Sequence, residues 1–231
     1  MILINIPKLN ILWFGLVKCI PTFVSEHLLT KTSNMNVTSF TERQIEIMEA
    51  ATHRIDSHGI QELTIKNLAA DLNLSEAALY RHFKSKNEIL LGLITYFVSS
   101  MNKRLAEILT DEEQHPSEQL KAMFDSQLKT FVKKPAIISI IFSEGIFQFN
   151  KELTDKVSGL MDIMRNNIIS IIKKGQEQGV YAKLLAPETI ATIVMGSMRM
   201  VVLKWKISGH KSNLVNDGKV VLSGLLKMLE S

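Results

Sequence analysis

The sequence predicts an all-α protein with a small N-terminal helical domain and a larger C-terminal helical domain. Two observations carry this prediction. Apolar residues recur at spacings of three and four along most of the chain after residue 40, which is the period of an amphipathic helix. Ser or Thr residues that can cap a helix precede several of these segments, at Thr41, Thr64, Ser75 and Ser85. The 11 Gly and 5 Pro among 231 residues rule out a collagen-like or low-complexity chain.

The composition is that of an ordinary globular chain. Apolar residues make up 46% and charged residues 22%, and 27 Lys and Arg against 23 Asp and Glu give a net charge of +4. A single Cys excludes an internal disulfide framework and a multi-Cys metal site, and it fits the reducing cytoplasm. The positive charge is concentrated locally, because Arg81, Lys84 and Lys86 lie together without an acidic residue between positions 80 and 86.

Residues 1–34 do not share the helical pattern. Their longest uncharged run, Leu9 to Val17, has nine residues, whereas a membrane-spanning helix needs about 20. The preferred interpretation is an upstream extension, with Met35 as the natural start. An extra helix packed on the body and a membrane anchor are the alternatives.

The first clear helix is expected to begin after Thr41 and to end at Gly59. Thr41 and Gln44 form a capping-box pattern, and Gly59 can adopt the left-handed conformation that terminates helices. The apolar face of this segment consists of Ile45, Met48, Ala51 and Ile55.

Two short helices joined by a tight turn follow. Thr64 caps a helix that ends near Asp71, and Ser75 caps a second helix that reaches Phe83. Asn73 lies in the turn and is one of the few non-glycine residues that tolerate positive φ. A further helix begins at Ser85, where Ser85 and Glu88 form a second capping box. The two short helices and the turn between them form a helix-turn-helix. The second helix of such a unit enters the DNA major groove with its N-terminal residues.

The segment from Thr64 to Leu90, above all the run Leu79-Tyr80-x-His82-Phe83-x-Ser85-Lys86, resembles the TetR/AcrR family of bacterial repressors over about residues 41–97. The resemblance implies that Thr64, Tyr80, His82 and Lys86 touch phosphates. It also implies that Ser75, Glu76, Ala77, Ala78 and Arg81 face the groove or its edge. Lys66 is a further DNA-binding candidate.

This chain departs from the family pattern at three positions. Asn73 replaces a usual Gly, Ala78 replaces a common Thr, and Glu76 replaces a frequent Lys. Glu76 could accept a hydrogen bond from a cytosine amino group, or it could simply stabilise the N-terminus of its helix. These departures affect the operator sequence that is read.

Residues 98–231 are expected to form a ligand-binding and dimerisation domain. Helices are predicted to begin at Pro116 and Pro135 and to span Lys151–Lys174, Pro187–Ile207 and about Ser212–Leu229. An apolar pocket for a small, hydrophobic effector would lie among the middle helices, with Glu144 and Asp162 as polar anchors. Its candidate walls are Phe124, Ile138, Ile141, Phe142, Phe147, Met161 and Met164.

The last two helices are the expected dimer face, because the family pairs them with their mates in a four-helix interface. The apolar faces are Ile190, Ile193, Val194, Ser197, Met198 and Val201, with Gly196, on the first helix, and Leu214, Val221, Leu222, Leu225, Leu226 and Leu229 on the second. The alternative is that these residues fill the core of the protomer. A two-fold dimer would place two recognition helices roughly 34–36 Å apart, one turn of DNA.

The function expected from residues and resemblance together is a cytoplasmic, homodimeric repressor that binds a palindromic double-stranded operator and is released by a small-molecule effector. Its domains are residues 35–97, with the helix-turn-helix at about 64–83, and residues 98–231. No catalytic motif, metal site or cofactor motif is found in the sequence, so we expect no enzyme and no membrane partner. The alternatives are a DNA-bound scaffold that recruits a protein without an effector, and a membrane-tethered regulator using residues 1–34.

Overall fold

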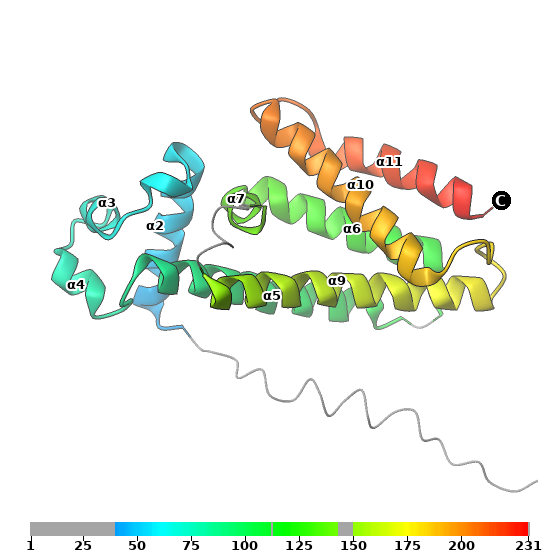
Figure 1. Ribbon diagram of the computed structural model, residues 1–231, viewed down its shortest axis with the longest axis horizontal. Coiled ribbons are helices and arrows are strands. Elements are labelled where there is room, and N and C mark those ends of the chain that lie inside the picture. The colour runs from blue at the N-terminus through cyan, green and yellow to red at the C-terminus, as the bar shows by residue number, and fades with distance from the viewer. Residues whose placement is uncertain (1–39, 112, 143–149, 231) are drawn as a thin grey trace, which may run out of the picture. The chain divides into compact units, whose positions relative to one another are not determined.

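The computed structural model describes residues 40–111, 113–142 and 150–230, and these residues form helices without any strand (Figure 1). The predicted all-α class is confirmed. In chain order the elements are α2 (Glu42–His58), the 3₁₀ helix η1 (Ile60–Glu62), α3 (Ile65–Asp71), α4 (Glu76–Tyr80), α5 (Lys86–Leu109), α6 (Pro116–Lys133), α7 (Ala136–Ile141), α9 (Lys151–Glu177), α10 (Pro187–Ile207) and α11 (Leu214–Leu229). Residues 1–34 and Met35 lie outside the described residues.

The helix α2 forms as its sequence signals require. The Thr41 hydroxyl accepts the Gln44 N–H, and the Gln44 side chain accepts the Thr41 N–H, so the predicted capping box is present. The helix ends at Gly59, whose φ of +85° is in the region open to glycine. Its inner face is completed by Ile47, which is fully buried.

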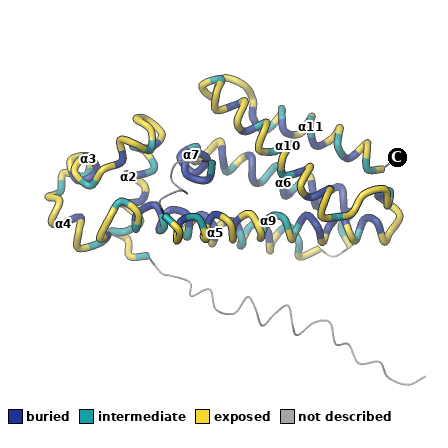
Figure 2. Tube along the Cα trace, in the orientation of Figure 1, coloured by how far each residue is buried: buried dark blue, intermediate teal, exposed yellow. Residues whose placement is uncertain are grey.

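The N-terminal helices enclose a small apolar core. The most deeply buried residues of this region lie on α2, α3, α4, the turn after α4 and the first half of α5 (Figure 2). They are Ile47, Ala51, Ile55, Leu68, Leu79, Phe83, Ile89, Leu90 and Ile94. This shared core fixes the short helices α3 and α4, which have seven and five residues, too few to be stable alone.

The larger bundle is built from α6, α9, α10 and α11 together with the second half of α5. The helices α6 and α11 approach closely at Gly218, where an added Cβ would lie 2.1 Å from Leu128 Cδ1. Gly175, inside α9, permits a similar contact with the ring of Tyr181. The short α7 is buried on nearly every side, as its run of Ile residues predicts.

Three boundaries differ from the sequence prediction. The helix α9 continues through Gly175 to Glu177, because Gly175 is needed for packing rather than for termination. The helix α11 begins at Leu214, where the Asn213 side chain accepts the Asn216 N–H. The predicted domain boundary at residue 97 falls inside α5, so the two predicted domains share that helix.

Candidate functional site

The helix-turn-helix is held by local caps that its sequence encodes. Thr64 accepts the Asn67 N–H at 3.1 Å and begins α3, and Ser75 accepts the Ala78 N–H at 3.1 Å and begins α4. Between the two helices Asn73 has φ of +53°, the left-handed turn conformation expected of it. The Leu79 side chain is fully buried and anchors α4 to the core of the N-terminal helices.

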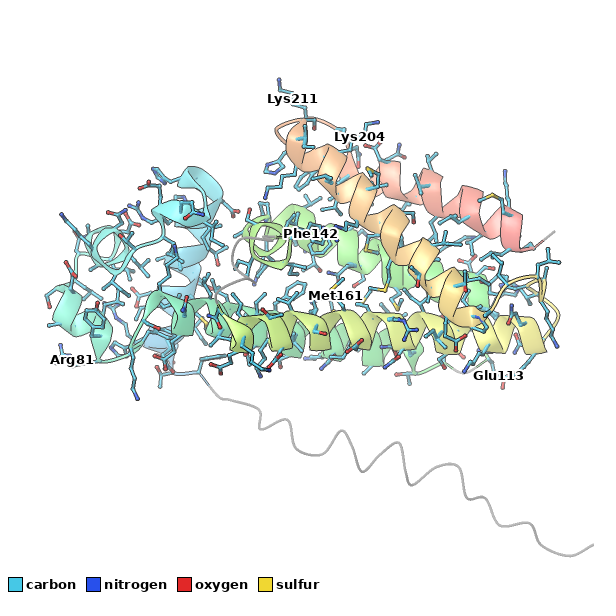
Figure 3. All side chains as sticks on the ribbon, in the orientation of Figure 1. Arg81, Glu113, Phe142, Met161, Lys204 and Lys211 are labelled. Carbon is cyan, nitrogen blue, oxygen red and sulfur yellow. The ribbon has the colours of Figure 1, made fainter. Side chains whose placement is uncertain are left out.

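The opposite face of α4 is open to solvent. Ser75, Glu76, Ala77, Tyr80 and Arg81 are exposed, and the Tyr80 side chain is 49% accessible. Figure 3 shows Arg81 beside α4, on the side of the molecule away from α10 and α11. An exposed helix that begins with small residues and is followed by a positively charged residue can lie in a DNA groove.

The recognition helix is shorter than predicted, because α4 ends at Tyr80 and not at Phe83. Arg81 and His82 form a turn that brings the Phe83 side chain into the core, where it is 2% exposed. The His82 carbonyl accepts a hydrogen bond from Gln44 Nε2 at 3.2 Å, which joins this turn to the start of α2. His82 and Ala78 are half-buried.

The expected phosphate contacts separate into two groups. Thr64, Lys66 and Tyr80 are exposed. Lys86 is half-buried, and its ammonium group donates to the Ile60 carbonyl at 2.9 Å. Burial lowers the pKa of Lys86, and the negative charge of Glu62 opposes that shift. In this structure Lys86 therefore holds η1 against α5 instead of pointing at solvent.

The predicted capping box at the start of α5 is only half correct. Ser85 accepts the Glu88 N–H at 3.2 Å as expected. The Glu88 carboxylate, however, accepts the backbone N–H of Lys84, one residue before the N-cap. This bond still satisfies a backbone donor at the helix start and fixes the turn after α4.

An ion pair that the sequence analysis missed joins α2 to α3. The Arg54 guanidinium donates from Nε and Nη2 to the two Asp71 carboxylate oxygens, at 2.5 and 2.6 Å. The hydrogen bond from Arg54 lowers the pKa of the Asp71 carboxyl, and burial opposes that shift. No sequence signal marks this pair, because its partners are 17 residues apart on different helices.

A cavity of about 470 Å³ lies in the C-terminal bundle, bounded by α5, α6, α7, α9 and α10. Four of the predicted wall residues, Ile141, Phe142, Met161 and Met164, line it, and so does Asp162. Figure 3 shows Phe142 and Met161 between α7 and α9. The cavity is mostly apolar, with a few charged groups at its edge, as small-molecule sites generally are.

The predicted wall needs correction at Phe124 and Ile138. Phe124 packs on α11, where its ring lies 3.2 Å from the Cβ position of Gly218, and Ile138 is fully buried in α7. Neither residue lines the cavity. Phe147 and Glu144 lie outside the described residues.

The sequence analysis missed the contribution of α10 to this cavity. Met195, Met198 and Arg199 line it from α10, and Arg165 lines it from α9. The Arg199 guanidinium lies 5.3 Å from the centre of the Phe142 ring. These residues were not assigned to the cavity from the sequence, because the preferred interpretation placed the apolar face of α10 against a second subunit.

The outer faces of α10 and α11 carry exposed apolar side chains, here called the α10–α11 stripe. Along α10 they occur at spacings of three and four if the exposed Gly196 is included, which places them on one side of the helix. The members of the stripe are Ile193, Gly196, Met200, Leu203 and Ile207 on α10 and Val220 and Met228 on α11. A row of exposed apolar side chains along one side of a helix is typical of an association site.

The predicted dimer face is wrong for its most buried members. Ile190, Val194, Leu214, Leu222 and Leu226 are at most 3% exposed, so they fill the core of the protomer. Both helices have apolar residues on more than one side, so sequence period did not separate the inward from the outward side.

The described residues contain neither a candidate membrane-spanning helix nor a candidate metal-binding cluster. None of the helices in this part of the chain is long and apolar enough to cross a membrane. The same residues contain no cluster of three or more His, Cys, Asp or Glu side chains that could hold a metal ion.

Comparison with solved structures gives the same fold. The fatty acid degradation regulator FadR from Bacillus halodurans superposes with a TM-score of 0.69 at 20% identity, covering 81% of this chain and 96% of that one. The ketosteroid transcriptional regulator KstR2 of Mycobacterium tuberculosis has a TM-score of 0.70 at 19% identity, covering 84% and 97%. At these identities the likeness concerns the fold.

Comparison with curated sequences finds nucleoid occlusion factors SlmA. The protein from Vibrio vulnificus is 29% identical over 157 residues, which cover 65% of this chain and 80% of the relative. The protein from Idiomarina loihiensis is 31% identical over 132 residues, or 57% of this chain and 65% of the relative.

Two family models together cover the chain from residue 47 to residue 228. The model for bacterial regulatory proteins of the tetR family matches residues 47–93, which contain the helix-turn-helix. The model for the C-terminal region of YsiA-like proteins matches residues 93–228, more than half of the chain. The chain belongs to the TetR family of bacterial regulatory proteins and is a dimeric, DNA-binding regulator of transcription rather than an enzyme.

Proposed function

We propose that this protein is a cytoplasmic repressor that holds a palindromic operator through α4 and releases it when a hydrophobic effector enters the cavity between α9 and α10. Its DNA-binding part comprises residues 35–97 and its regulatory part residues 98–231, with α5 common to both. The observation that carries the proposal is the exposed face of α4, built on two capped helices and an anchored core.

On DNA, the residues of α4 would divide into two roles. Ser75, Glu76, Ala77 and Ala78 start the helix and would approach base edges, where two alanines permit close contact. Arg81 follows the helix and would reach the edge of the groove. Thr64, Lys66, Tyr80 and His82 would contact phosphates.

Lys86 is the one phosphate candidate that must change its bond to act. Its ammonium group is held by the Ile60 carbonyl, so a phosphate contact would require that hydrogen bond to be shared or exchanged. We assign it primarily a positioning role for η1. Replacing Lys86 by Met is therefore expected to reduce stability as well as operator affinity.

The test of DNA binding is a selection from random duplex DNA with the full chain, followed by fluorescence anisotropy on the recovered sequence at several salt concentrations. An enriched palindrome is expected. Tyr80→Phe removes only the hydroxyl that would contact a phosphate, so it should weaken operator binding. Lys66→Ala removes one cation from each chain. Lys66→Ala is expected to lower the salt slope by about two, because a dimer loses one phosphate contact at each half-site, whereas Lys103→Ala, an exposed lysine on α5, should leave it unchanged.

If no sequence is enriched, specific operator binding is refuted. If a sequence is enriched but Tyr80→Phe and Lys66→Ala bind like the unmodified protein, the assignment of these contacts is refuted while the operator remains.

The effector is expected to be largely apolar with an anionic end. Apolar walls from Ile141, Phe142 and Met164 would hold its body, and the lining carries two cations, Arg165 and Arg199, against the one carboxylate of Asp162. The regulator FadR from Bacillus subtilis, which shares the fold with a TM-score of 0.64 at 20% identity, was crystallised with stearoyl-CoA. Long-chain acyl thioesters are therefore the first compounds to test.

Release would follow from unequal binding to two conformations, because a ligand shifts an equilibrium only by its difference in affinity for the two states. Acyl thioesters should weaken operator binding in the anisotropy assay and raise the melting temperature of the DNA-free protein. Met164→Trp, which fills the cavity from a buried position on α9, should abolish both effects while operator binding without ligand persists. Unchanged release by the Trp variant would refute this site.

A second candidate function is a role at the nucleoid rather than at a promoter. It is favoured by the curated relatives from Vibrio vulnificus and Idiomarina loihiensis, which are named nucleoid occlusion factors. The chain would then act as a DNA-bound scaffold that recruits a protein. Mapping its sites by chromatin immunoprecipitation separates the two: a few promoter sites support a local repressor, and many sites spread over the chromosome support the scaffold.

A further inference from the structure

We propose that a second ligand site lies at the junction of the DNA-binding helices with the bundle, and that it takes a small carboxylic acid with an apolar body. A pocket of about 230 Å³ is present there, separate from the effector cavity. Binding to it stands independently of the proposed function, and only its effect on operator affinity rests on that function.

The pocket is formed by four helices from both parts of the chain. Its lining residues are Ile45, Met48, Glu49 and Thr52 from α2, Leu93, Tyr96, Phe97, Ser100 and Arg104 from α5, Thr130, Lys133 and Lys134 from the end of α6, and Ile137 from α7. None of them lines the effector cavity. A ligand seated here would touch α2 and the bundle at once.

The charge of the lining favours an anion. Arg104, Lys133 and Lys134 supply three positive charges, and Glu49 supplies one negative charge. The Lys134 ammonium lies 5.2 Å from the centre of the Tyr96 ring, so one cation is positioned directly over an aromatic wall.

Arg104 has donor capacity that the protein does not use. Its Nη1 donates to Ser100 Oγ at 2.7 Å and its Nε to Ser126 Oγ at 3.3 Å. Its Nη2 is buried and has no hydrogen-bond partner among the described residues. A buried guanidinium N–H without an acceptor is unfavourable, and a carboxylate is the acceptor that matches its geometry. Because Nη2 is itself closed to solvent, the Arg104 side chain has to turn toward the pocket before a bound carboxylate can accept from it.

The two threonine hydroxyls of the lining already donate within the protein. Thr52 donates to the Met48 carbonyl at 2.9 Å, and Thr130 donates to the Ser126 carbonyl at 2.8 Å. The remaining wall is apolar, from residues such as Leu93, Phe97 and Ile137. The site thus combines a cationic end with an apolar body, and its volume suits a compact acid.

The test is titration of the full chain with benzoate and hexanoate, followed by isothermal calorimetry and by amide chemical shifts. Benzamide and hexanamide are the neutral probes of the same shape. Saturable binding of the acids is expected, with the amides at least about tenfold weaker because they lack the charge-assisted bonds. Amide shifts should centre on the first half of α2, the middle of α5 and the end of α6, which line the pocket.

Variants separate this site from its neighbours. Arg104→Met should weaken acid binding at least about tenfold, whereas Lys103→Met, on the exposed side of the same helix, should leave it unchanged. Lys134→Met, an exposed substitution, should weaken binding by a smaller factor and serves if Arg104→Met fails to fold. Met161→Trp obstructs the effector cavity and should not affect binding of the acids.

Equal binding of acids and amides, no saturable binding at millimolar concentration, or full binding by a folded Arg104→Met variant would overturn the site. Because these measurements contain no DNA, they remain valid if the proposed operator binding fails. In the anisotropy assay the acid should change the operator affinity of the unmodified protein and of Met161→Trp by the same factor. If the acid binds but operator affinity does not change, the regulatory role is overturned.

Discussion

The α10–α11 stripe leads to a quantitative prediction for Met200→Lys. Met200 lies in the middle of the stripe on α10, and its side chain is 64% exposed in the protomer. If the stripe forms the dimer contact, this exposed surface is buried when two chains associate, and by two-fold symmetry it is buried twice.

The magnitude follows from the surface removed from water. Complete burial of a Met side chain contributes about 1.5–3 kcal/mol. Since 64% of the side chain is available, each copy contributes about 1–2 kcal/mol and the dimer loses about 2–4 kcal/mol. That corresponds to dimerisation weakened by about 30- to 1,000-fold, and the charge introduced by Lys adds to this effect.

The assay is sedimentation velocity over a concentration series, paired with operator anisotropy. Met200→Lys should sediment as a monomer at concentrations where the unmodified chain is a dimer, and its operator binding should weaken in parallel. Leu184→Lys is the matched control, because Leu184 is 84% exposed and lies in the connection before α10, outside the stripe. An unchanged dimer in Met200→Lys, or equal loss in Leu184→Lys, would refute the assignment of the stripe.

Two further predictions concern stability. Gly175→Ala should lower the melting temperature despite the better helix propensity of Ala, because the added Cβ would lie 2.2 Å from the Tyr181 ring. Gly159→Ala on the same helix meets no atom within 4 Å and should raise the melting temperature by about 2–4 °C. Equal shifts of the two variants, measured by calorimetry, would contradict the packing argument. Asp71→Asn should lower the free energy of unfolding at pH 7, because Arg54 lowers the pKa of Asp71 in the folded chain and the ionised carboxylate therefore stabilises the fold. This contribution is present above the ordinary Asp pKa of about 4 and is lost as the pH falls through the lowered value, so denaturation curves of variant and unmodified protein should converge in acid and stay apart at neutral pH.

Local features of the fold were predictable from the sequence, because the atoms that decide them are close along the chain. Thr64 and Ser75 begin helices through bonds to residues three positions ahead, and Asn73 sits in the turn that its conformational tolerance suggests. Short-range hydrogen bonds of this kind are visible as residue spacings. The element order and the start of α10 at Pro187 followed in the same way.

Features that depend on helix packing were not predictable. Lys86 binds a carbonyl 26 residues away, and no spacing rule distinguishes that partner from a phosphate. The apolar residues of α10 point both inward and outward, so Val194 was assigned to the dimer face although it is buried in the protomer. Phe124 was assigned to the cavity for the same reason, since an apolar residue on a core helix can face any of several neighbours.

The shared helix α5 has a mechanical consequence. Its 24 residues form a rod about 36 Å long, of which the first turns belong to the DNA-binding core and the last turns to the bundle. If one end is tilted by about 5° while the other stays fixed, the free end moves about 3 Å, close to the roughly 3.4 Å step between successive base pairs. A small displacement of the bundle end of α5 can therefore shift the DNA-binding end by about one base-pair step. Substitutions that make the middle of α5 more flexible should uncouple the bundle from the DNA-binding helices without changing a residue of either.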